Sequence, residues 1–148
     1  MGDIAGMIII IDTREQAPYE FTDYDVAVVR STLPCGDYSI PGAEHLVSIE
    51  RKMLDDLISC LMGKNRDRFE RELGRLRSYH VAAVVVEAGW QDISRGRYTS
   101  NMKPQSALQS VIAMQVRGQG FVYFFWRNKR FRLFAWLWPS ADCQVQIE

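Results

Sequence analysis

Continuous apolar runs alternate with amphipathic stretches along this chain. The runs at 7–11 and 81–87 predict strands buried on both faces, and the run at 121–126 predicts a third. Apolar residues at helical spacing predict helices from the residue after Lys52 to Gly63, and at 66–79, 104–117 and 128–138. Residues 26–32 fit a short strand or a helix, and 89–98 fit a loop or a short helix. This alternation predicts an α/β fold with a mixed central β-sheet flanked by helices.

A β-hairpin is predicted between the first buried strand and the first predicted helix. Residues 35–40 and 45–51 read as its strands, and Pro41 and Gly42 suit the turn between them. Side chains alternate along the second strand, so Glu50 and Lys52 share its polar face. A turn centred after Gly42 would place Asp37 one diagonal step from Glu50, at roughly 7–8 Å.

Two carboxylates beside a lysine suit metal-assisted cleavage of a phosphodiester. Asp37 and Glu50 could hold Mg²⁺, which prefers oxygen ligands, and Lys52 could stabilise charge on the phosphate. The same residues also fit ordinary solvated strand charges, because acid-x-lysine tripeptides are common. Asp12 and its neighbours, at the end of the first buried strand, are placed either for function or for capping a loop.

Composition indicates one soluble domain covering residues 1–148, with residues 1–6 as a poorly ordered lead-in. The chain is 47% hydrophobic and 24% charged, which allows a sizeable core. Its formal net charge of zero means that phosphate binding must rely on local basic patches. No apolar run approaches the roughly 20 residues of a membrane helix, and no secretory signal is evident. Three cysteines without metal-ligand spacing read as free thiols, so we expect an intracellular protein with no membrane partner, cytoplasmic in a bacterium or phage and nuclear in a eukaryote.

Two further segments are candidates for contacts with partners. Lys64, Arg66 and Arg68, at the start of the second helix, could bind phosphates, although such charges more often form a solvated helix face. The aromatic residues of 121–138 either close the core or form a protein interface.

Taken together, these motifs resemble the nuclease signature of the XPF family of structure-specific endonucleases. The signature is GD, a variable gap and then ERK-x-x-x-D, preceded by an aspartate at the end of a strand. Here it reads Gly36-Asp37, then Glu50-Arg51-Lys52 with Asp56 four residues after Lys52, preceded by Asp12-Thr13-Arg14-Glu15. The likeness extends over about residues 7–138.

The resemblance implies a restriction-endonuclease-like core and specific roles for these residues. Asp37 and Glu50 correspond to metal ligands and Lys52 to the catalytic lysine. Asp12 corresponds to a third acid of the metal site, either a ligand or a holder of metal-bound water. The supporting positions, expected to orient these groups or contact phosphate, are Arg14, Glu15, Arg51 and Asp56. Because alternation places Arg51 on the apolar face of its strand, we expect it to form an ion pair with a nearby acid.

The family resemblance also implies a substrate and partners. We expect a metal-dependent endonuclease that uses Mg²⁺, with Mn²⁺ as a substitute, and cuts branched, flap or fork DNA as a homodimer or heterodimer. RNA remains an alternative substrate, since the metal chemistry does not depend on the sugar. A catalytically silent DNA-binding or scaffold subunit is the alternative function. No helix-hairpin-helix module is evident, so we expect a stand-alone core of phage or prophage type.

Overall fold

The computed structural model describes residues 6–22, 24–118 and 122–124. In this part of the chain six strands form one sheet in the order β2-β1-β3-β4-β5-β6. The strands are β1 (Met7–Asp12), β2 (Val26–Ser31), β3 (Tyr38–Ser39), β4 (Val47–Lys52), β5 (Val81–Val86) and β6 (Val122–Phe124). β3 is antiparallel to both of its neighbours, whereas the other pairs are parallel, so the sheet is mixed, as predicted.

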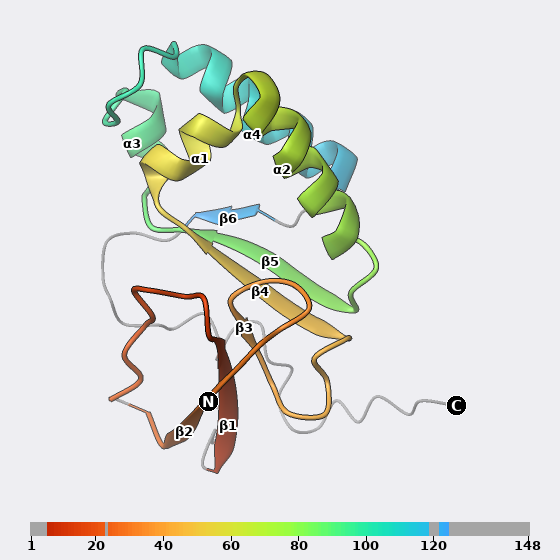
Figure 1. Cartoon of the computed structure of the whole chain (residues 1–148). Coiled ribbons are helices and arrows are strands. Elements are labelled where there is room, and N and C mark those ends of the chain that lie inside the picture. Colours follow the sequence, from red (N-terminus) through yellow and green to blue (C-terminus); the bar gives the residue numbers. More distant parts are fainter. Residues whose placement is uncertain (1–5, 23, 119–121, 125–148) are drawn as a thin grey trace.

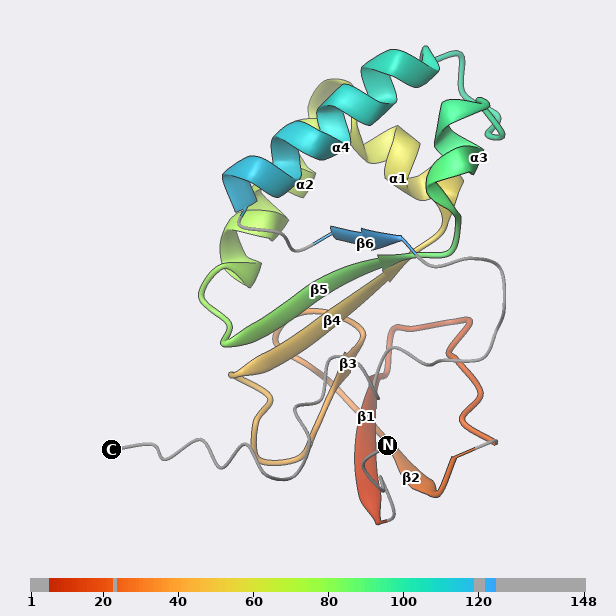
Figure 2. The same cartoon turned by 180° about the vertical axis from the view of Figure 1, so that it is seen from behind.

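Four helices pack together on one side of the β4–β5–β6 half of the sheet (Figures 1 and 2). They are α1 (Leu54–Cys60), α2 (Gly63–Leu76), α3 (Trp90–Ser94) and α4 (Pro104–Gly118). Apolar residues at helical spacing on α1 and α2, such as Leu57, Phe69 and Leu73, bury against Val84 and Val86 of β5. No helix in the described ranges is long and apolar enough to cross a bilayer.

The opposite face of the sheet has its own smaller core. Ile11 of β1, Ile49 of β4 and Val85 of β5 meet the fully buried Tyr38 there. Phe21, from the segment between β1 and β2, packs edge-on against the Tyr38 ring, with 6.3 Å between ring centroids. Apolar residues on both faces of β4 and β5 explain why these strands read as nearly continuous apolar runs.

Several element boundaries differ from those that the sequence predicted. Residues 26–32, which fitted two structures, form strand β2. The first helix ends at Cys60 rather than at Gly63, and Gly63 instead begins α2 with a φ of 55°. A glycine tolerates this left-handed conformation, so it turns the chain between two helices. The predicted helix at 128–138, the ends of the predicted strand at 121–126 and most of the lead-in lie outside the described residues.

The hairpin register also differs from the prediction, by two residues. Tyr38 pairs with Ile49, so Asp37 lies beside Glu50 rather than opposite Ser48. The shift arises because residues 40–47 form a longer turn, in which Leu46 and Val47 N–H both donate to the Ala43 carbonyl. Asp37 and Glu50 are therefore direct neighbours at the edge of the sheet, closer than the diagonal arrangement would make them.

Gly36 allows this close approach of the two hairpin strands. Its φ is 76°, and a Cβ at this position would collide with the Ser48 side chain and lie 3.0 Å from the Ile49 carbonyl oxygen. The next residue, Asp37, donates its N–H to that same carbonyl at 2.8 Å. A glycine before the aspartate is thus a steric requirement of the fold.

We predict that Gly36→Ala destabilises the protein more than Gly42→Ala. Both glycines have positive φ, so each substitution should cost about 1–2 kcal/mol of backbone strain. Only Gly36 also faces a collision, which should add about 1–3 kcal/mol. Urea denaturation of the two variants measures the difference, and equal loss of stability would contradict the steric role of Gly36.

Candidate active site

Strand direction brings the predicted site residues to one edge of the sheet. β1 and β4 run in the same direction because each is antiparallel to β3. Asp12 at the end of β1 and Glu50 and Lys52 at the end of β4 therefore reach the same edge. Asp37 reaches it too, because it immediately precedes β3.

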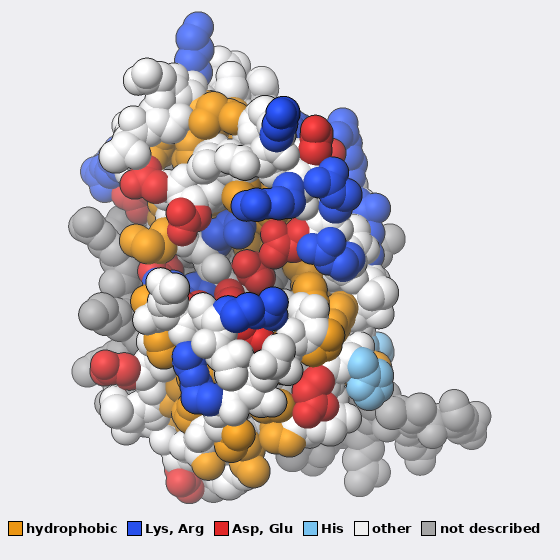
Figure 3. Space-filling view, in the orientation of Figure 1, with side chains coloured by type: hydrophobic (Ala, Val, Ile, Leu, Met, Phe, Trp, Pro, Cys, Tyr) orange, Lys and Arg blue, Asp and Glu red, His pale blue; other side chains and the backbone are white. Residues whose placement is uncertain are grey.

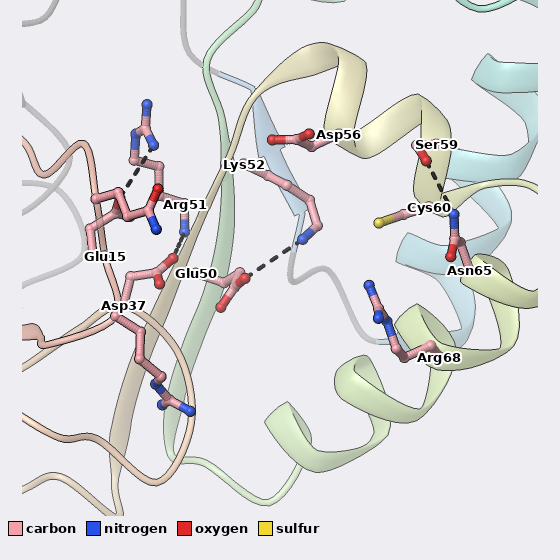
Figure 4. Close-up of a pocket in the computed structure, with 12 residues that line it drawn as sticks. Glu15, Asp37, Glu50, Arg51, Lys52, Asp56, Ser59, Cys60, Asn65 and Arg68 are labelled. Carbon is pink, nitrogen blue, oxygen red and sulfur yellow. Dashed lines mark hydrogen bonds and ion pairs between the residues drawn. The ribbon is translucent and has the colours of Figure 1, made fainter.

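A pocket of about 390 Å³ opens at this edge, between the sheet and helices α1 and α2 (Figure 4). It is lined by Arg14, Glu15, Gln16, Asp37, Glu50, Arg51, Lys52, Asp56, Ser59, Cys60, Asn65 and Arg68. On the molecular surface, acidic side chains lie in the hollow and Lys and Arg side chains border it over α2 (Figure 3). The pocket thus brings the carboxylates of Asp37 and Glu50, on the sheet side, opposite Arg68 on α2.

Asp37 and Glu50 form a carboxylate pair with a strong preference for neutralisation. Burial, with the charge of Glu15, raises the pKa of Asp37 to about 6, although the Arg51 backbone N–H donates to its Oδ2 at 2.8 Å. Burial and the charges of Asp37 and Glu72 raise the pKa of Glu50 well above its usual range. Both shifts favour either protonation or a cation between the two groups.

Lys52 carries a charged ammonium group within this pocket. Its Nζ lies 3.6 Å from Glu50 Oε1 and 5.1 Å from the centre of the Phe69 ring. Burial disfavours the charge, but Glu50 and Glu72 outweigh burial and raise the pKa of Lys52. A protonated lysine can donate hydrogen bonds and stabilise negative charge, but it cannot accept a proton.

Arg51 points to the other face of β4 and forms the predicted ion pair. Its guanidinium makes two hydrogen bonds to Glu87, of 2.8 and 2.9 Å, and lies 3.6 Å from Glu15. It also stacks over the Tyr19 ring, 5.6 Å from the centroid. Arg51 is thereby fixed between β5 and the loop after β1, which in turn fixes the backbone N–H that holds Asp37.

The structure does not bring Asp12 into the carboxylate pair. The buried Asp12 carboxylate accepts hydrogen bonds from Arg14 N, Nε and Nη2 and from Leu33 N, at 2.7 to 3.1 Å. Arg14 holds the pKa of Asp12 down at about 2. All of these donors compete with a cation, so Asp12 here anchors Arg14, whose mostly exposed side chain lines the pocket.

The three predicted phosphate-binding residues take different positions on α2. Arg68 points from α2 into the pocket (Figure 4). Arg66 is engaged elsewhere, with Nε 3.0 Å from Glu70 and Nη1 3.4 Å from Ser110 of α4. Lys64 is exposed near the start of α2 and is not part of the pocket lining.

Several residues on the helical side of the site are not among those that the sequence predicted. Ser59, Cys60 and Asn65 line the pocket, and Glu72 lies close enough to Glu50 to raise its pKa. Their spacing could have indicated this arrangement. Asn65, Arg68 and Glu72 are three and four residues apart, so they share one face of α2. That face borders the apolar face formed by Phe69, Leu73 and Leu76.

The donor set at the edge of the sheet fits a hard divalent cation. Asp37 and Glu50 supply two carboxylates that burial makes costly to leave charged, and Mg²⁺ is commonly bound by one or two carboxylates with waters and phosphate oxygens. Within the described residues no group of three acidic, histidine or cysteine side chains converges on one point. The protein thus offers two ligands, and the remaining positions would fall to water and substrate.

Comparison with known proteins identifies the family. The profile of the ERCC4 domain matches residues 11–131. The chain belongs to the ERCC4 domain family. No curated protein matches the chain.

Solved structures show that this ERCC4 domain shares its fold with a part of XPF. XPF from Aeropyrum pernix superposes with a TM-score of 0.62 at 22% identity, covering 80% of this chain and 53% of the XPF chain. The same protein in complex with DNA gives a TM-score of 0.62 at 22% identity, covering 81% and 56%. The ERCC4 domain described here therefore spans just over half of those XPF chains. The predicted restriction-endonuclease-like core is confirmed.

We predict that Asp37→Asn stabilises the metal-free protein at pH 8 but not at pH 4. Because the pKa of Asp37 is raised in the folded state, from 3.8 to about 6, the unfolded chain releases this proton first as pH rises. As the pH rises from 3.8 to about 6, ionisation of Asp37 progressively lowers the free energy of unfolding, and above about pH 6 this loss of stability reaches its full size. In EDTA at pH 8 the variant should melt about 5 °C higher than wild type.

The matched control is Asp67→Asn, which removes an exposed carboxylate of α2. Its melting temperature relative to wild type should not change between pH 4 and pH 8. If Asp37→Asn were destabilising at pH 8 by as much as at pH 4, the carboxylate pair would not be under electrostatic strain.

Proposed function

We propose that this ERCC4 domain is a metal-dependent DNA endonuclease that hydrolyses phosphodiester bonds at branched, flap or fork DNA. The observation that carries the proposal is the pocket in which Asp37 and Glu50 lie beside Lys52 and face Arg68. A carboxylate pair next to two cations matches the needs of a reaction that adds negative charge to a phosphate. The likeness to an XPF structure solved with DNA supports DNA as the substrate.

Asp37 and Glu50 are the residues that would hold Mg²⁺, or Mn²⁺ in its place. Such a cation, when bound, polarises a phosphoryl oxygen and favours ionisation of an attacking water. The protein contributes the orientation of the pair. The Arg51 N–H holds Asp37 at 2.8 Å, and the pairing of Tyr38 with Ile49 keeps Asp37 next to Glu50.

Lys52 acts as an electrostatic stabiliser of the transferred phosphoryl group. Its ammonium is already charged and is held beside Glu50, so it can donate to a phosphoryl oxygen without reorganisation. Packing over Phe69 restricts the flexible side chain to the pocket. Arg68, opposite it on α2, is placed to contact the same or an adjacent phosphate (Figure 4).

Asp12 acts through Arg14 in this proposal. Its carboxylate fixes the Arg14 guanidinium at the rim of the pocket, where the exposed cation can contact the DNA backbone. Asp12 also ties its backbone N–H to the Asp37 carbonyl at 2.8 Å, so it supports the carboxylate pair mechanically. Glu15 and Glu87 also support the carboxylate pair, because they form ion pairs with Arg51, whose backbone N–H donates to Asp37.

One observation favours the second candidate, a catalytically silent DNA-binding subunit. Because Asp12 is engaged with Arg14 and Leu33, the described residues supply two carboxylates for a cation rather than three. A silent subunit would keep the basic surface around the pocket but would gain no stability from divalent cations. The two functions therefore differ in a measurable response to Mn²⁺.

The test is a cleavage panel with labelled flap, fork, splayed-arm and plain duplex DNA, and one flap of RNA. We predict cutting of branched DNA with Mg²⁺ or Mn²⁺ and none in EDTA. Asp37→Asn, Glu50→Gln and Lys52→Ala should each slow cleavage by about three orders of magnitude, or about 4 kcal/mol. Asp37→Asn and Glu50→Gln should still bind DNA, because both substitutions remove negative charge from the pocket.

Asp67→Asn serves as the control and should cut like wild type. Two results would oppose the proposal: undiminished cleavage by Asp37→Asn, or a wild-type protein that binds branched DNA but neither cuts it nor gains thermal stability from Mn²⁺. The second result would indicate the silent subunit.

A further inference from the structure

Helix α2 carries a row of cations that extends away from the pocket. The residues are Lys64, Arg68, Arg71 and Arg75, which follow one another at intervals of four, three and four. At 3.6 residues per turn they fall within about 60° of the helix circumference. All four are exposed, and we call them the α2 stripe.

The α2 stripe has no acidic residue within it. Asp67 and Glu72 flank it on either side, and Arg66 lies on another face, where it pairs with Glu70. Within the described part of the chain none of the four stripe residues forms an ion pair. Neighbouring cations three or four residues apart repel each other and cost a helix roughly 0.2–0.5 kcal/mol per pair.

The stripe is continuous with the pocket. Arg68 belongs to both, since it lines the pocket and stands second in the row. Figure 3 shows Lys and Arg side chains gathered over α2 next to the acidic hollow. From Lys64 to Arg75 the helix rises about 16 Å, which equals the rise of about five base pairs of duplex DNA.

We propose that the α2 stripe binds the phosphodiester backbone of one strand for about five nucleotides beside the bond that is cut. Arg68 then sits at the phosphate nearest to the pocket, and Arg71 and Arg75 contact phosphates successively farther away. This inference rests on the proposed function, since it assigns the DNA contacts of the same site. It replaces the predicted set of Lys64, Arg66 and Arg68 by a row in which Arg66 has no part.

The experiment measures DNA affinity in EDTA, so that no DNA is cut, at 50 to 200 mM salt. The variant Arg71→Glu/Arg75→Glu is compared with Arg77→Glu, which reverses an exposed cation just beyond α2 on a different face. On a duplex-containing flap we expect the double variant to bind at least tenfold more weakly at 100 mM salt. In a plot of log K against log salt concentration, the slope of the double variant should be smaller in magnitude by about two. Each lost phosphate contact accounts for about 0.9 of this change.

Arg77→Glu should stay within twofold of wild type in both affinity and salt dependence. If the double variant behaves like Arg77→Glu while wild-type protein still binds and cuts flaps, the stripe proposal is wrong and the nuclease proposal stands. If wild-type protein binds no DNA, both proposals fail. The increase in melting temperature with Mn²⁺ should be equal in all three proteins, because Asp37 and Glu50 are intact.

Discussion

Two carboxylates, those of Asp37 and Glu50, are held close together where burial and like charge make their ionisation unfavourable. The other residues of the site serve to keep this pair in place. Asp37 and Glu50 would each prefer water, and their pKa values are raised because burial and like charge oppose ionisation. Only a rigid scaffold can keep such a pair in place. Gly36 permits the close approach of the strands, the Arg51 N–H fixes one carboxylate and Lys52 lies beside the other.

The cationic residues near this pair divide into two groups. Arg51 and Arg14 are held by acids, on Glu87 and Asp12 respectively, and each stabilises a segment that borders the pocket. Lys52 and Arg68 line the same pocket, but Lys52 lies beside Glu50 of the carboxylate pair, and Arg68 forms no ion pair within the described part of the chain. This division gives the acids around the site different tasks. Asp37 and Glu50 face the pocket, whereas the carboxylates of Asp12 and Glu87 serve mainly to place arginines.

Much of the fold and part of the site could be predicted from the sequence. Buried strands and amphipathic helices follow from hydrophobic periodicity, and strand alternation alone placed Arg51 away from Lys52 and predicted its ion pair. The hairpin register could not be predicted, because it depends on how residues 40–47 fold and on a steric clash at Gly36 that only three-dimensional packing reveals. The engagement of Asp12 depends on Leu33, 21 residues away, and Glu72 approaches Glu50 only after α2 has packed on the sheet.

The most direct test of this account is anomalous diffraction from crystals of the protein grown with Mn²⁺. We expect an anomalous peak between the carboxylates of Asp37 and Glu50, within about 2.5 Å of oxygens from both, while Asp12 stays hydrogen-bonded to Arg14 and Leu33. An ion bound through Asp12 with Arg14 displaced would contradict the division of tasks among the acids. Absence of any peak beside Asp37 and Glu50 would contradict the central claim that their electrostatic strain serves to bind a cation.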